Sequence, residues 1–202
     1  RILRFFQEFF EHPGGLVIWA SRFQGQFYHL PWAGALVIAL GATGFAWVLQ
    51  RLVTGTGAWP AMLWVLVPPV LLLGLHTYSC HALADTAGLI LVHGAVLFLR
   101  AHRGRVLPWL QALVLTALLY VLAGAYFWFF VAWALADPLR LPSPLPRWPL
   151  ALFALALPVI AWQWVYQMSL EVAFVGPALW LPLPEAGHRE LRIGLFVVLL
   201  ML

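Results

Sequence analysis

The sequence predicts an all-α fold: a polytopic bundle of transmembrane helices with two amphipathic interfacial helices at its N-terminal end. Of the 202 residues, 64% are apolar and only 9% are charged. Soluble domains have about 45–50% apolar and about 25% charged residues. Apolar runs of about 20 residues, the length that a helix needs to cross a bilayer, recur along the chain. This composition excludes a soluble globular domain, and its many aromatic residues exclude a disordered chain.

The first 31 residues form a separate region that precedes the bundle. Apolar and polar side chains fall on opposite helical faces over residues 1–12 and again over residues 16–30, and Pro13-Gly14-Gly15 separates the two stretches. Neither stretch is apolar enough to span a bilayer. We therefore expect two helices that lie along the membrane interface. A soluble cap packed on the bundle is the alternative.

Residues 32–202 form the transmembrane bundle, as a fragment of a longer protein. A sixth span begins near Leu191, and the sequence stops after twelve of its residues, which is the reason to expect a longer protein. Pro68-Pro69 lies in the middle of the second span and should kink it. The five complete spans that we expect cover residues 32–52, 59–75, 82–100, 108–136 and 149–171.

The fourth of these spans is unusually long. At about 1.5 Å per residue, 108–136 exceeds a hydrocarbon core of roughly 30 Å. We favour one long tilted helix over a helix that is broken near Gly124.

Tryptophans and arginines predict how the bundle sits in the membrane. An aromatic belt requires tryptophans at span ends, and five fall there: Trp32, Trp59, Trp109, Trp148 and Trp180. Arg100, Arg103 and Arg105 form the densest basic cluster and should be cytoplasmic, together with Arg51. By alternation, residues 1–31, the link His76–His81 and the Pro-rich segment 137–148 should be extracytoplasmic.

The candidate catalytic residues are the acids at the extracytoplasmic rim: Glu8, Glu11 and Asp85. An ionisable residue inside a span is costly and indicates a functional site, and Asp85 lies one turn inside the third span on the same face as His81. For Asp85, a charge pair or cap that orients the start of that helix is the alternative. We expect His93, deeper in the same helix, to be a hydrogen-bonded packing residue.

The candidate substrate-binding residues lie at the same rim and on the fifth span. Gln163, Gln167 and Glu171 recur every four residues, so they form a polar stripe that should face a cavity or a partner helix. Hydrogen bonding between helices explains the glutamines equally well. The residues that we expect to bind substrate are Arg22, His76, His81, Gln163 and Gln167.

No metal, cofactor or nucleic acid is expected. A metal site could be assembled from His76, His81, Asp85 and Cys80, but their spacing matches no established motif. Haem would need two histidines on facing helices, which a link between spans does not provide. The net charge of +4 comes with no water-soluble basic face that could bind nucleic acid.

A set of short motifs runs through residues 13–36: Pro13–Leu16, Trp19, Arg22-Phe23, Gln26-Phe27-Tyr28 and Pro31-Trp32 with Gly34. Together they resemble the first long loop of an uncharacterised family of bacterial polytopic membrane proteins. Further similarity continues through residues 76–83 and Tyr120–Gly124. The resemblance implies a multi-pass protein of the bacterial cytoplasmic (inner) membrane, and it implies no activity.

The layout of residues 1–31 also resembles that of C-fold membrane glycosyltransferases. Those enzymes have a long outer loop with interfacial helices and an acidic catalytic residue, and they use polyprenyl-phosphate sugars. The resemblance puts Glu8 or Glu11 in the place of that acid. The acid-containing signature of the family is absent here.

Two functions follow from these observations. An enzyme would transfer a sugar from a lipid carrier at the extracytoplasmic face, with Glu8 or Glu11 as general base and Arg22 bound to a phosphate. Asp85, His76 and His81 would line its pocket. The alternative is a non-catalytic structural or accessory subunit of a larger complex, in which the aromatic side chains pack on lipid and on other membrane subunits. The bilayer, a lipid-linked substrate and such subunits are thus the expected partners.

Overall fold

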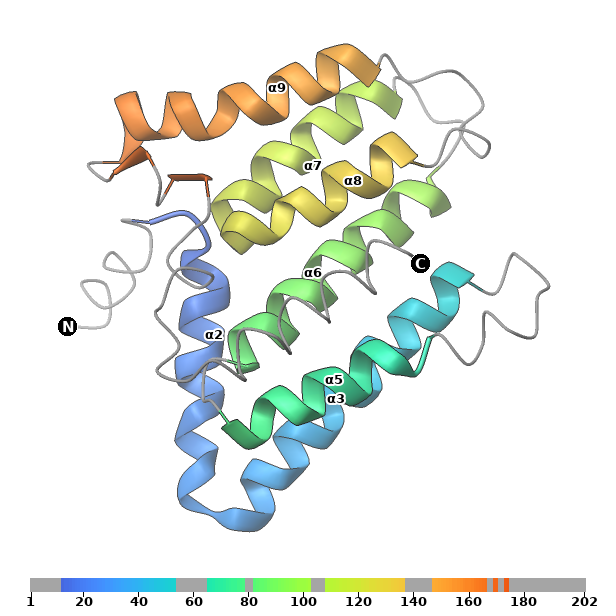
Figure 1. Ribbon diagram of the computed structural model, residues 1–202, viewed down its shortest axis with the longest axis vertical. Helices are drawn as coiled ribbons and strands as arrows, with labels where there is room; N and C mark the ends of the chain where they lie inside the picture. Colours follow the sequence, from blue (N-terminus) through green and yellow to red (C-terminus); the bar gives the residue numbers. More distant parts are fainter. Residues whose placement is uncertain are drawn as a thin grey trace.

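The computed structural model describes residues 12–53, 65–78, 82–102, 108–136, 147–166, 169–170 and 173–174. Within these residues all regular structure is helical, which confirms the all-α class (Figure 1). The main elements are α2 (Gly15–Gly25), the 3₁₀ turn η1 (Gln26–His29), α3 (Pro31–Val53), α5 (Val67–Tyr78), α6 (Ala82–Ala101), α7 (Pro108–Ala123), the 3₁₀ turn η2 (Gly124–Tyr126), α8 (Phe127–Ala136), α9 (Arg147–Ile160) and the π-turn η3 (Ala161–Val165).

The helices from α3 to α9 lie side by side in an array, and each runs back along the one before it (Figure 1). In this array α6 is central, because it packs on α3, α5, α7 and α8. The helix α2 runs across the ends of the array and packs on α6 and α7.

Four stretches are long and apolar enough to cross a membrane: Pro31–Val53, Leu83–Ala101, Trp109–Ala136 and Trp148–Val165. The first two agree with the spans predicted at 32–52 and 82–100. By length and composition, these helices are consistent with a membrane protein.

The second predicted span differs from the structure in its described part. Val65 and Leu66 form a turn and α5 begins only at Val67, so in the described residues the break lies before Pro68-Pro69 and the kink expected at these prolines is wrong. Pro68 and Pro69 therefore occupy the first turn of α5 and do not kink a helix interior. A proline in the first turn removes an N–H that has no intrahelical partner in any case.

The long stretch 108–136 is a hairpin and not the single tilted helix that the sequence favoured. Tyr126 contacts Asp85 near the start of α6, whereas Trp133 lies under Arg100 near its end, so α8 runs parallel to α6. Pro108 follows the last residue of α6 by seven residues, too few to return along its length. Hence α7 starts where α6 ends and α8 folds back beside it, as Figure 1 shows. The alternative break near Gly124 is the correct one.

The hairpin changes the end of the helix array at which the Pro-rich segment 137–148 is expected. The last residue of α8, Ala136, and the first of α9, Arg147, flank residues 137–146 and lie at the end of the array where α6 ends (Figure 1). The sequence had put residues 137–148 at the opposite end, with residues 1–31, because it counted 108–136 as one crossing. That assignment is wrong.

The fifth predicted span ends earlier than expected. After α9, the π-turn η3 ends at Val165, and Tyr166 is extended with φ −121°. The continuous helix that would carry Gln163 on one face is therefore interrupted at Tyr166. Gln163 is exposed, and the other two residues of the expected stripe, Gln167 and Glu171, lie outside the described residues.

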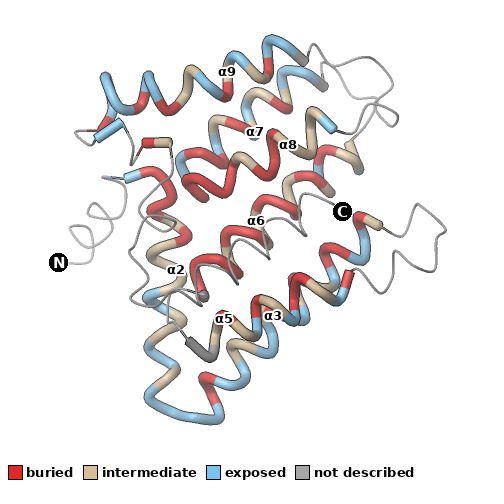
Figure 2. Tube along the Cα trace, viewed as in Figure 1, coloured by how far each residue is buried: buried red, intermediate tan, exposed pale blue. Residues whose placement is uncertain are grey.

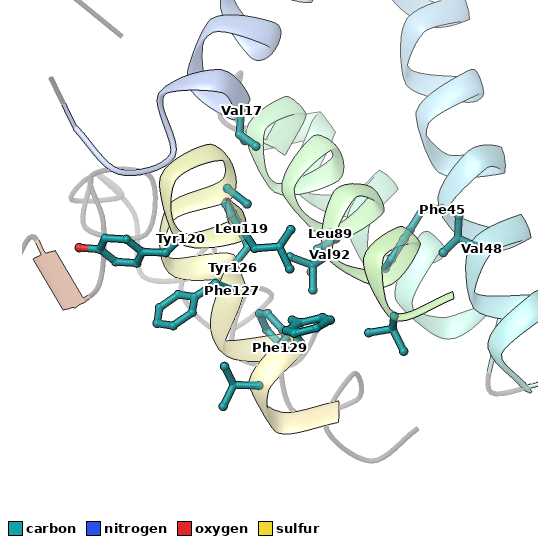
Figure 3. Close-up of a cluster of buried hydrophobic side chains, with 14 of the residues drawn as sticks. Val17, Phe45, Val48, Leu89, Val92, Leu119, Tyr120, Tyr126, Phe127 and Phe129 are labelled. Carbon is teal, nitrogen blue, oxygen red and sulfur yellow. The ribbon is translucent and has the colours of Figure 1, made fainter. Parts of the chain in front are cut away.

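Buried apolar side chains form one core centred on α6 and the α7–α8 hairpin (Figure 2). In Figure 3, Leu89 and Val92 of α6 lie between Phe45 of α3 and the aromatic side chains of the hairpin. By contrast, the outward faces of α3 and α9 expose leucines and tryptophans, as expected of surfaces that contact lipid.

Two glycines join α2 to the tip of the hairpin. Gly14 (φ +86°) and Gly124 (φ +62°) both adopt the left-handed conformation that favours glycine. The Gly14 N–H donates to the carbonyl of Val121 at 2.9 Å. A Cβ atom on Gly124 would lie only 2.9 Å from the carbonyl oxygen of Pro13, and one on Gly14 only 3.1 Å from the Gly124 Cα. We call this contact the glycine clasp.

Replacing Gly124 by alanine should destabilise the fold, because alanine would be strained at positive φ and would collide with Pro13. The expected loss in the free energy of unfolding is about 1–3 kcal/mol, measured by reversible unfolding in detergent micelles. Gly94→Ala is the matched control: nothing lies within 4 Å of its added Cβ, so this helical substitution should be neutral or stabilising. Equal effects of the two substitutions would contradict the clasp.

Candidate functional site

A pocket of about 280 Å³ lies between α2, α3, α5 and α6. The helices α3 and α6 approach each other closely where they line the pocket, since a Cβ on Gly41 would lie 2.9 Å from the Thr86 Cγ2. The last turns of α2 and α5 supply one polar side chain each. The lining residues are Gln24, Val37, Leu40, Gly41, His76, Leu83, Thr86, Ala87 and Ile90.

The polar end of the pocket is built around His76. Its Nε2 lies 2.9 Å from the Thr86 hydroxyl, within hydrogen-bond distance. Its Nδ1 is buried and has no hydrogen-bond partner among the described residues. His76 lies in α5, which at 12 residues is too short to span a bilayer alone. Burial lowers the pKa of this imidazole, so the ring is neutral at neutral pH.

Asp85 is buried on a different side of α6 and is not among the lining residues. Only 1% of it is exposed, and its carboxylate accepts a hydrogen bond from the Tyr126 hydroxyl at the tip of the hairpin. The Tyr126 ring packs directly on Gly88, where a Cβ would lie 2.4 Å from the ring. This arrangement fits the alternative considered for Asp85, that it orients the start of α6.

Of the other predicted site residues that the structure describes, none lines this pocket. Arg22 is exposed on α2, and it is two residues from Gln24, so it faces roughly the other way. Gln163 is exposed in η3. The remaining candidates lie outside the described residues: Glu8, Glu11, His81 and Gln167.

Among the predicted residues that lie in the described part of the chain, only His76 lines the pocket, and sequence reasoning missed Gln24 and Thr86. Gln24 belonged to the polar face of a predicted interfacial helix, a pattern that does not distinguish a pocket from solvent. Thr86 is adjacent to Asp85, and the sequence pointed to Asp85 as the site residue because a charged side chain inside a span is unusual. The sequence feature behind this part of the pocket is Thr86 on one apolar helix and the small residue Gly41 on another. The sequence does not show that these two residues face each other.

Two further polar residues of α6 serve packing, the buried His93 and the partly buried Arg100. The His93 Nδ1 donates to the carbonyl of Leu89 at 2.8 Å, and its ring contacts the edges of Phe45 and Trp133. This confirms the expected packing role. Arg100 donates to the carbonyl of Leu52 at 2.8 Å, with its guanidinium over the Trp133 ring.

Among the described residues, no group of three or more His, Cys, Asp or Glu side chains could hold a metal ion. His81 and Cys80, which the sequence had considered beside His76 and Asp85, lie outside those residues. The described part of the site therefore offers hydrogen bonding and apolar contact.

Comparison with known protein families places the chain beside a family without an assigned function. The model of a family of unknown function, DUF6057, matches residues 3–202. No curated protein and no solved structure matches.

The bond between Asp85 and Tyr126 should appear as coupling in a double-mutant cycle. Tyr126→Phe leaves a buried carboxyl group without this donor and should lower the free energy of unfolding by about 1–3 kcal/mol. Asp85→Asn with Tyr126→Phe should cost less than the sum of the single changes, by about 1 kcal/mol. Tyr120→Phe is the control: its hydroxyl bonds to the Ala173 carbonyl, so its effect should add to that of Asp85→Asn. Additive effects in both pairs would contradict the assigned role of Asp85.

Proposed function

The chain belongs to DUF6057, a family of unknown function, and we propose that it is a membrane protein that binds a lipid or lipid-linked ligand at one membrane interface. The pocket beneath α2 carries this proposal. Its lining offers the His76 imidazole, the Gln24 amide and the Thr86 hydroxyl, and the other lining residues are apolar. A ligand with a polar head and a hydrocarbon chain matches this combination.

Exposed tryptophans support a membrane frame in which α2 lies at an interface. Trp32 (69% exposed) and Trp164 (80%) lie toward the α2 end of the array. Trp47 (54%) and Trp148 (81%) lie toward the other end. Along α3 the two tryptophans are about 22 Å apart, comparable to a hydrocarbon core of roughly 30 Å. Such belts mark the two interfaces.

The surface of α2 has the character of an interfacial helix. The rings of Trp19 and Phe23 stack at 5.7 Å, and Phe23 meets the edge of Phe27 at 5.8 Å. Phe23 and Phe27 are 49% and 42% exposed, with the exposed Arg22 beside them. Aromatic rings next to a basic side chain suit the head-group region.

The arginines favour an extracytoplasmic position for the pocket. Arg51 and Arg100 end α3 and α6 at the side opposite α2, and Arg147 begins α9 at that same side. Cytoplasmic loops carry the excess of arginine. The proposed setting is the bacterial cytoplasmic membrane, with α2 and the pocket at the outer leaflet.

The enzymatic alternative is transfer of a sugar from a lipid carrier, with the carrier's phosphate bound by Arg22 outside the pocket. Glu8 or Glu11 would then act as general base on an acceptor hydroxyl. These residues precede the glycine clasp, which holds His12–Gly14 beside the hairpin tip. Asp85 is better suited to positioning α6 than to catalysis, because its carboxylate already accepts the Tyr126 hydroxyl.

Filling the pocket should displace its ligand. Ala87→Phe adds a ring inside the pocket, so purified protein should retain about tenfold less bound lipid, counted by native mass spectrometry. Ala101→Phe is the matched control, because it makes the same change at an exposed position on the same helix. If the two variants carry the same lipid complement, as a purely structural subunit would, the proposed function fails.

The proposed orientation can be tested with single cysteines in a Cys80→Ser background. Gln26→Cys at the α2 end should react with a membrane-impermeant maleimide in intact cells. Ala101→Cys at the opposite end should react only after permeabilisation. The reverse pattern would contradict the extracytoplasmic assignment, and labelling of both from one side would contradict the span between them.

A further inference from the structure

We propose that the pocket selects a lipid whose head group is uncharged and carries hydroxyl groups, with His76 and Gln24 forming the hydrogen bonds that recognise it. This inference rests on the proposed function and names the ligand class of the same site.

The charge of the lining supports a neutral head group. No Asp, Glu, Arg or Lys side chain is among the described residues that line the pocket. Arg22 is exposed and points away from Gln24, and the Asp85 carboxylate is bonded to Tyr126. Phosphate is recognised by charge-assisted hydrogen bonds, and burying an ionised group without such a partner is costly. A phosphate head group would therefore be disfavoured here.

The unpartnered Nδ1 atom of His76 favours a ligand that carries a hydroxyl group. The Nδ1 atom is buried without a partner among the described residues, while Nε2 is engaged with Thr86. A buried polar atom that lacks a hydrogen bond destabilises the empty pocket. The imidazole is neutral, so its Nδ1 either donates or accepts, depending on the tautomer. A hydroxyl satisfies both cases, because it is a donor and an acceptor at once.

Gln24 and the pocket size point to the same class. The amide of Gln24 can donate and accept, as recognition of several hydroxyl groups requires. The volume of about 280 Å³ is just below the range of about 300–1,000 Å³ for drug-sized ligands. It therefore suits a single head group and the first carbons of its chains, which would lie against Val37, Leu40 and Ile90.

The test is a competition between two lipids with the same chains. The full-length chain in detergent is mixed with equal amounts of a dioleoyl glucosylglycerol lipid and dioleoyl phosphatidylglycerol, and bound lipid is counted by native mass spectrometry. The wild type should retain the glucolipid over phosphatidylglycerol by about tenfold. His76→Phe should bring this ratio close to one. Gln24→Leu should also lower this ratio. Because Gln24 lies on the half-exposed surface of α2, this variant tests the assignment even where His76→Phe fails to fold.

His102→Phe is the control, since His102 lies at the far end of α6, away from the pocket, and its Nδ1 donates to the Phe98 carbonyl; its ratio should equal that of the wild type. Equal retention of both lipids, or a preference for phosphatidylglycerol, overturns the head-group assignment. If Ala87→Phe still blocks that retention, the proposed function stands. If neither lipid shows retention that depends on Ala87, the proposed function fails as well.

Discussion

The glycine clasp is the contact on which the rest of the structure depends. Gly14 and Gly124 both have positive φ, and their backbones approach so closely that a Cβ on either would collide with the other segment. This contact holds α2 across the ends of the array, where its Gln24 lines the pocket. It also fixes the point at which α8 turns back, which brings Tyr126 to Asp85. The position of α2, the hairpin and the buried acid are thus consequences of one backbone junction.

The two polar features near the start of α6 have different physical roles. Asp85 and Thr86 are consecutive residues and face different neighbours, the hairpin tip and the pocket. A buried carboxyl group is tolerated only when it is hydrogen-bonded, and Tyr126 meets that need from within the fold. His76 retains a buried ring nitrogen with no partner among the described residues. The first arrangement stabilises the protein as it stands, and the second leaves a position that a ligand can fill.

Hydropathy alone was enough to predict the helical class and the spans that became α3 and α6. It could not predict the hairpin, because an apolar run of 29 residues has the same composition whether it continues or folds back. Whether the chain folds back at this point depends on the backbone of Gly124 and on its contact with Pro13, more than 100 residues away in sequence. Asp85 was correctly singled out as unusual, but its partner lies 41 residues further on. His76 was predicted for the site, whereas Gln24 and Thr86 become recognisable only when α2, α3 and α6 are packed together.

A structure of the protein in lipid nanodiscs that contain a neutral glycolipid would test the central claim most directly. That claim is that the clasp holds α2 at the membrane interface over a lipid-binding pocket. The account predicts α8 beside α7, α2 at head-group depth, and lipid density whose head group contacts His76 and Gln24. An α2 that projects into water, or lipid density confined to the outer faces of α3 and α9 with an empty pocket, would contradict it.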